Sequence, residues 1–237
     1  MRRKTFLSFL TVFVFIFCPQ NIQKAFGIEE SLVKENAVQT RIDDVGTKIL
    51  NSNKIDERIV FVYDKTEQKE KLNIDKTLVT RQIVLYGYDY KFIEDDNELA
   101  AFLSRRIAEA HRSYAGVFNG RLSSLKIKAA PKKFQLVFDK LAVDYMVHSG
   151  YNPVALITLI NKTYPQKRSD ALSTSNLASK RLAVIYEYIY TKYPYYLLHN
   201  EYFNNVHYQN FLLTSAENRK KLEEKVKLRS RGELDYE

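Results

Sequence analysis

Two adjacent arginines and a glutamate interrupt the apolar segment of residues 97–112, at a spacing typical of one helical turn. Arg105 and Glu109 are four residues apart, so in a helix both lie on one face and can form an ion pair. The guanidinium groups of Arg105 and Arg106 stay protonated and have no lone pair, so they can neither accept a proton nor bind a metal ion. The chemistry open to these arginines is therefore ion pairing or anion binding.

The apolar positions around these residues resemble the active-site helix of a zinc peptidase. Gluzincin zinc metallopeptidases, the group that includes HtpX, BepA and the CAAX prenyl protease, typically have E-L-A-A-V-L-A-H-E-I-x-H there. In those enzymes the two histidines bind one zinc ion and the glutamate activates the zinc-bound water. The resemblance places the histidines at Arg105 and Glu109 and the glutamate at Arg106, so it implies the fold without the usual catalytic residues.

Two later segments extend this resemblance. Residues 135–153 are similar to the family pattern E-x-x-A-D-R-L-A-V-D-Y-L-V-K-A-G-Y-D-P. The family's third zinc ligand corresponds to Gln135, a neutral amide, whereas the aspartate that supports a zinc histidine is present as Asp139. Residues 172–182 resemble S-T-H-P-x-x-x-x-R-I, with the histidine replaced by Ser175 and the arginine retained as Arg181.

By this resemblance, the catalytic and zinc-binding residues of the family are replaced here, whereas the apolar positions around them are similar. The replaced positions are Arg105, Arg106, Glu109, Gln135 and Ser175. We predict no bound zinc or other cofactor and no peptide hydrolysis. We predict instead that Arg105 lies within salt-bridge reach of Asp139, with Glu109 close by, as a structural network in the vacated metal site. A pocket in which the arginines bind an anion is the alternative reading.

The four histidines do not indicate a different metal site. They are His111, His148, His199 and His207. Glu109 and His111 are two apart, so on a helix they point to different faces. We therefore predict that the chain has no metal site.

The first 27 residues have the pattern of a secretory signal peptide. Basic residues 2–4 precede an apolar run of about 12 residues, and Ala25-Phe26-Gly27 offers small residues for cleavage after Gly27. An uncleaved anchor is the alternative, although roughly 20 apolar residues are needed to span a bilayer. Cleavage would remove Cys18, the single cysteine, and with it any disulfide chemistry. We expect an exported protein of the periplasm, cell envelope or extracellular space, with membrane association only through an uncleaved N-terminus.

Hydrophobic spacing and turn residues predict a mostly helical α+β fold. The predicted helices cover residues 28–51, 81–93, 97–115, 134–148, 153–163, 176–193 and 216–231, and the predicted strands cover 58–63 and 77–80. The resemblance implies helices packed on a small, mostly antiparallel sheet. We predict a metallopeptidase-like domain over residues 28–200 and a C-terminal extension over residues 201–237 with a charged helical tail.

Tyrosines cluster between Tyr186 and Tyr208. Tyrosine is common in partner surfaces, although these residues could equally complete the core. The modest basic excess of the mature chain does not indicate nucleic-acid binding. The function we predict is an exported, inactive pseudopeptidase that binds or scaffolds an envelope protein. Two alternatives are an active zinc metalloendopeptidase with non-standard ligands and a protein that binds small anions or glycans.

Overall fold

The computed structural model describes residues 19–67, 81–114, 131–164, 177–230, 232, 234 and 236. The chain forms two compact units, residues 1–37 and 38–237. The described part of the first unit, residues 19–37, lies in helix α1 (Pro19–Ser52). Most of the predicted signal peptide, including Cys18, lies outside the described residues. No helix in the described part of the chain combines the length and apolarity that crossing a membrane requires.

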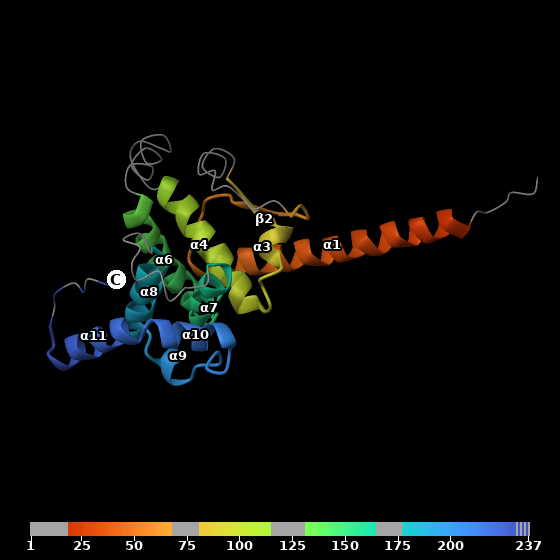
Figure 1. Cartoon of the computed structure of the whole chain (residues 1–237). Coiled ribbons are helices and arrows are strands. Elements are labelled where there is room, and N and C mark those ends of the chain that lie inside the picture. Colours follow the sequence, from red (N-terminus) through yellow and green to blue (C-terminus); the bar gives the residue numbers. More distant parts are fainter. Residues whose placement is uncertain are drawn as a thin grey trace, which may run out of the picture. The chain divides into compact units, whose positions relative to one another are not determined.

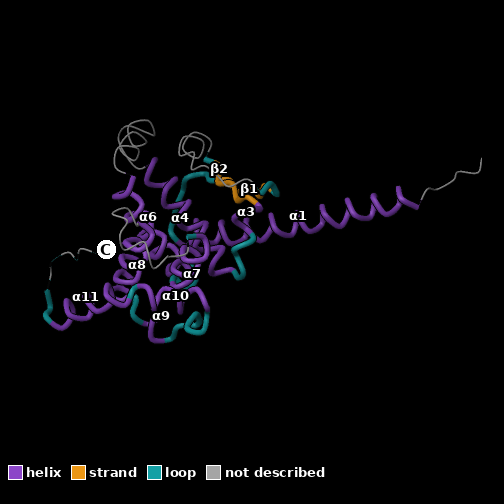
Figure 2. Tube along the Cα trace, in the orientation of Figure 1, coloured by secondary structure: helices purple, strands orange, loops and turns teal. Residues whose placement is uncertain are grey.

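The second unit is mostly helical, as the sequence predicts, with one small sheet (Figures 1 and 2). After α1, its described elements are β1 (Val60–Asp64), β2 (Gln82–Tyr86), α3 (Gly87–Tyr90), α4 (Asp96–Tyr114), α6 (Pro131–His148), α7 (Val154–Thr163), α8 (Leu177–Lys192), α9 (Tyr195–Leu198), α10 (Val206–Thr214) and α11 (Ala216–Lys227).

The two described strands run parallel, so the prediction of a mostly antiparallel sheet is wrong for this part of the chain. Val60 pairs with Gln82, and the register continues to Asp64 and Tyr86. Parallel strands cannot be joined by a tight hairpin and need a long connection, which residues 65–81 provide. The strand predicted at residues 77–80 lies outside the described residues.

The helix predicted over residues 81–93 is also wrong, because its first half is strand β2. Ile83 and Leu85 are buried while their neighbours are half-buried, which is the two-residue period of a strand. Gly87 then begins the short helix α3. A Cβ atom at Gly87 would lie 2.8 Å from the backbone oxygen of Lys65, so this close approach of two backbone segments requires glycine.

Helix α4 carries the apolar pattern that suggested the peptidase fold. Asp95 caps it by accepting a hydrogen bond from the backbone N–H of Glu98 at 2.7 Å. The apolar positions of the pattern are all fully buried in the core: Leu99, Ala100, Ala101, Leu103, Ile107 and Ala108. Helix α4 packs against α6 and α7, which fixes the face on which its polar residues meet their partners.

Helix α7 is the central helix of the unit. Its residues 154–162 are all buried, which is typical of a helix surrounded by others, and it packs against α4, α8 and α10. Gly150, with φ of +74°, ends the preceding helix α6 as predicted. The N–H groups of Gly150 and Tyr151 bond back to Val147 and Met146, which is a Schellman motif.

The C-terminal segment joins the same hydrophobic core. Tyr202, Tyr208 and Phe211 are buried members of that core although they lie beyond residue 200. Helix α10 was not predicted, because its apolar residues show no clear helical period. Asn205 caps α10 by accepting hydrogen bonds from the backbone N–H groups of His207 and Tyr208.

Candidate functional site

A buried carboxylate on α6 is shared by two arginines from different helices. Nε of Arg181 donates to Oδ2 of Asp139 at 2.7 Å, and Nη2 of Arg181 donates to Oδ1 at 2.8 Å. Nε of Arg105 donates to the same Oδ1 at 3.1 Å. Arg105 therefore lies within salt-bridge distance of Asp139, as predicted. Arg181 adds a bidentate contact that orients the carboxylate of Asp139.

The two arginines are not equivalent electrostatically. Burial opposes the charge of Arg181, but Asp139 outweighs it and raises the pKa of Arg181. Burial lowers the pKa of Arg105, and the positive charge of Arg181 lowers that pKa further. Arg181 and Asp139 thus form the closer pair, and Arg105 is a second guanidinium beside a carboxylate that is already bonded at both oxygens.

Arg106 and Glu109 form a second pair one turn along α4. Nη1 of Arg106 lies 3.5 Å from Oε2 of Glu109, and both side chains are largely buried. The guanidinium of Arg106 also lies 5.6 Å from the centre of the Phe102 ring. The sequence predicted that Glu109 would lie close to the contact between Arg105 and Asp139, where it could also pair with Arg105. The structure pairs Glu109 with Arg106, while its charge still favours the charged form of Arg105.

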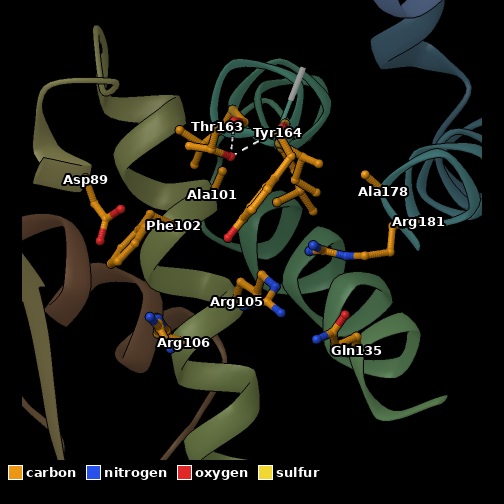
Figure 3. Close-up of a pocket in the computed structure, with 13 residues that line it drawn as sticks. Asp89, Ala101, Phe102, Arg105, Arg106, Gln135, Thr163, Tyr164, Ala178 and Arg181 are labelled. Atoms are coloured by element: carbon orange, nitrogen blue, oxygen red, sulfur yellow. Dashed lines mark hydrogen bonds between the residues drawn. The ribbon is translucent and has the colours of Figure 1, made fainter. Parts of the chain in front are cut away.

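These residues border a pocket of about 310 Å³ between α4, α6, α7 and α8 (Figure 3). The guanidinium groups of Arg105 and Arg181 point toward each other, and Gln135 lies beside them. Asp89, Phe102 and Arg106 lie at a different side of the pocket. The remaining lining residues are mostly apolar: Ala101, Leu156, Leu159, Ile160, Thr163, Tyr164 and Ala178. The pocket therefore combines a cationic end with an apolar wall.

The amide of Gln135 has an unsatisfied oxygen at this cationic end. Its Oε1 is buried and has no hydrogen-bond partner among the residues that the structure describes. A buried acceptor without a donor is unfavourable by about 1–3 kcal/mol. A donor supplied by a ligand in the pocket would remove this cost.

The described histidines do not assemble a metal site. Within the described ranges, no three His, Cys, Asp or Glu side chains lie close enough to hold a metal ion. Nδ1 of His111 lies 3.0 Å from Oε1 of Glu57, and Nδ1 of His148 lies 2.9 Å from Oδ1 of Asn53. Both histidines thus lie close to polar protein groups that do not line the pocket.

The tyrosine-rich segment divides between the core and the surface. The hydroxyl groups of Tyr188 and Tyr193 each donate to Asp144, and Tyr202 is buried. Tyr195 is exposed. Large exposed apolar side chains occur in the same region at Leu198, Phe203, Val206 and Leu213. The segment therefore contributes side chains both to the core and to an exposed apolar surface over α9 and α10.

The structure brings together most of the residues singled out in the sequence. Arg105, Arg106 and Gln135 line one pocket, and Asp139 contacts Arg105 from outside that lining. Ser175 lies outside the described residues. Arg181 had no predicted part in the network, although the match of this arginine to the family pattern was the available signal. No protein-family model, no curated protein and no solved structure matches this chain.

Proposed function

We propose that this chain is an exported, metallopeptidase-like protein without hydrolytic activity, a pseudopeptidase that binds or scaffolds a protein of the cell envelope. The observation that carries the proposal is the ion-pair network of Arg105, Asp139 and Arg181. It joins α4, α6 and α8, the helices whose sequences resemble the three metal-site segments of the gluzincins. We propose that guanidinium groups hold these helices together, as a metal ion and its supporting aspartate do in those enzymes.

Electrostatics favours this proposal over an active zinc enzyme with non-standard ligands. A zinc site needs about four ligands, with one position open to water in a catalytic site. Near the pocket, the carboxylates of Asp139 and Glu109 are already paired with arginines. A divalent cation there would also be repelled by guanidinium groups a few ångströms away.

The exposed apolar surface over α9 and α10 supports a binding role. Leu198 and Leu213 are 80% and 79% exposed, and a contiguous exposed apolar patch is typical of an interaction site. Tyr195 and Phe203 add aromatic rings to the same region. This surface gives the proposed scaffold a place to contact its partner that is separate from the pocket.

The decisive experiment measures metal content and hydrolysis on the same sample. We expect protein purified from the envelope fraction to contain far less than one zinc per chain by elemental mass spectrometry. We also expect it not to cleave unfolded substrate proteins in a chelator-sensitive manner. Intact-mass analysis of that sample should give a chain that begins at Ile28. One zinc per chain with chelator-sensitive cleavage would establish the alternative, and an intact Met1 would establish the anchor.

Variants that rebuild the zinc ligands provide the control. Arg105→His alone should not bind zinc, because Gln135 and Glu109 still occupy two of the three ligand positions. A fourfold variant restores the zinc-binding motif of the family: Arg105→His, Arg106→Glu, Glu109→His and Gln135→Glu. Its zinc content tests whether this fold accepts a zinc site. Stoichiometric zinc in Arg105→His alone would contradict the proposed ligand positions.

A further inference from the structure

The cationic end of the pocket has more positive charge than its nearest carboxylate can neutralise. Asp139 is fully buried and is bonded at both oxygens by Arg181. Among the described residues, Arg105 contacts Asp139 through Nε, so its terminal nitrogens can donate to a further acceptor. Burial and the charge of Arg181 both lower the pKa of Arg105, and an added anion would offset both effects. Of the other carboxylates nearby, Glu109 favours the charged forms of both arginines but is paired with Arg106, and Asp89 lies at the side of the pocket near Phe102 and Arg106 (Figure 3).

The same end of the pocket also holds a buried acceptor that no donor reaches. Oε1 of Gln135 is buried and has no partner among the described side chains and backbone, and Gln135 lies beside Arg105 and Arg181 in Figure 3. A ligand that satisfies this end must therefore present an anionic acceptor to the arginines and an N–H or O–H donor to Gln135. A plain fatty acid anion has the acceptor and lacks the donor.

Most of the remaining lining of the pocket is apolar. Leu156, Leu159 and Ile160 project from α7 into the pocket, and Ala101 and Ala178 leave space beside them. A volume of about 310 Å³ is at the lower end of the range for small-ligand pockets, roughly 300–1,000 Å³. The pocket thus suits one amino-acid residue with its side chain better than it suits a long chain or a sugar polymer. Inorganic phosphate would leave the apolar wall without a contact.

We propose that this pocket binds the C-terminal residue of a peptide that ends in an apolar amino acid. The free carboxylate contacts Arg105 and Arg181, the amide N–H of the last residue donates to Gln135, and the apolar side chain packs against Leu156, Leu159 and Ile160. This inference rests on the proposed function, because it names the ligand of a binding protein that does not cleave. The same chemistry is present in a free N-acylated amino acid, so the test separates the two sources.

Binding is measured by isothermal titration calorimetry with the full chain and four probes. The probes are the peptide acetyl-Gly-Gly-Ala-Leu with a free carboxylate, the same peptide with a C-terminal amide, N-acetyl-leucine, and octanoate. Losing a charge-assisted hydrogen bond to arginine should weaken binding of the amidated peptide by about tenfold or more. Octanoate should also bind more weakly than the acid peptide, because it has no donor for Gln135.

Three results would overturn the proposal. They are equal binding of the acid and amide peptides, equal or tighter binding of octanoate, and binding of N-acetyl-leucine alone with exclusion of the peptide. The last result would assign the pocket to a free N-acylated amino acid. Comparable binding of N-acetyl-leucine and the acid peptide supports recognition of the terminal residue.

A variant at Gln135 tests the site without removing an arginine. Gln135→Glu places a carboxylate beside Arg105 and Arg181, where it competes with the ligand for the same donors, so peptide binding should fall about tenfold or more while the melting temperature does not fall. Gln82→Glu on β2 makes the same chemical change away from the pocket and should bind as the wild type does. Wild-type binding by Gln135→Glu would refute the site. Zinc content and hydrolysis decide the pseudopeptidase proposal independently of this outcome.

Discussion

Replacement of Arg181 by methionine should be among the most destabilising single changes at the pocket. Arg181→Met removes both short hydrogen bonds to Asp139. Among the described side chains, the 3.1 Å contact from Arg105 then remains as the one ion pair of this fully buried carboxylate. Removing one partner of a buried ion pair costs about 3–5 kcal/mol. Because Arg105 remains and can compensate in part, we expect a loss of about 3 kcal/mol in the free energy of unfolding.

Arg105→Met should cost less, about 1–2 kcal/mol, because it removes one charge-assisted hydrogen bond. The loss of repulsion with Arg181 offsets part of this cost. The order of the two variants follows from geometry, since Arg181 makes two contacts with Asp139 and Arg105 makes one. A model in which both arginines are equivalent predicts equal losses.

Urea unfolding followed by far-ultraviolet circular dichroism at pH 7 measures these differences. Arg41→Met is the matched control, because Nε of Arg41 lies 2.7 Å from Oδ1 of Asp96, the same separation as in the Arg181–Asp139 pair. The Arg41 and Asp96 side chains are 31% and 61% exposed, so their pair should contribute about 0–1 kcal/mol. If Arg181→Met costs no more than Arg41→Met, or less than Arg105→Met, then Arg181 is not the main partner of the Asp139 carboxylate.

Three further changes test other contacts. Lys162→Met should lower the free energy of unfolding by about 3–5 kcal/mol, because it leaves the fully buried Glu98 without its cation at 2.7 Å. Adding Glu98→Gln should recover part of this loss. No recovery in urea unfolding would disprove the coupling between Lys162 and Glu98. Gly150→Ala should cost about 1–2 kcal/mol through its φ of +74° alone, since the added Cβ meets nothing within 4 Å, and a thermal melt identical to wild type would contradict this. Burial and the hydrogen bond to Asp95 raise the pKa of Tyr202 above its ordinary value of 10.0, so the folded state holds this proton more tightly than the unfolded state. This stabilisation is full below pH 10 and is lost as the pH rises above 10. Tyr202→Phe should therefore lose less stability than wild type in melts from pH 8 to 11. Tyr195→Phe, at an exposed position, is the control and should follow the wild-type slope.

Local patterns in the sequence determined much of the helical framework. The apolar spacing of residues 97–112 predicted a helix that the structure has as Asp96–Tyr114, and Gly150 marked the end of α6. These features depend on neighbours within one or two turns, so the sequence contains all the necessary information. The error at residues 81–93 also has a local cause, because a short apolar run such as Ile83 to Leu85 fits a helix or a strand until its pairing partner is known.

The residues of the site were likewise visible in the sequence, but their arrangement was not. The arginines at positions 105 and 106 led us to predict that the usual zinc chemistry is absent, and Asp139 was identified as the carboxylate that an arginine should satisfy. Only the tertiary structure decided that Arg181, 42 residues from Asp139, makes the stronger contact, and that Glu109 pairs with Arg106. The physical reason is that a buried charge pairs with the opposite charge that helix packing brings within hydrogen-bond distance. The packing of α4, α6 and α8 depends on contacts between residues that are far apart in the chain.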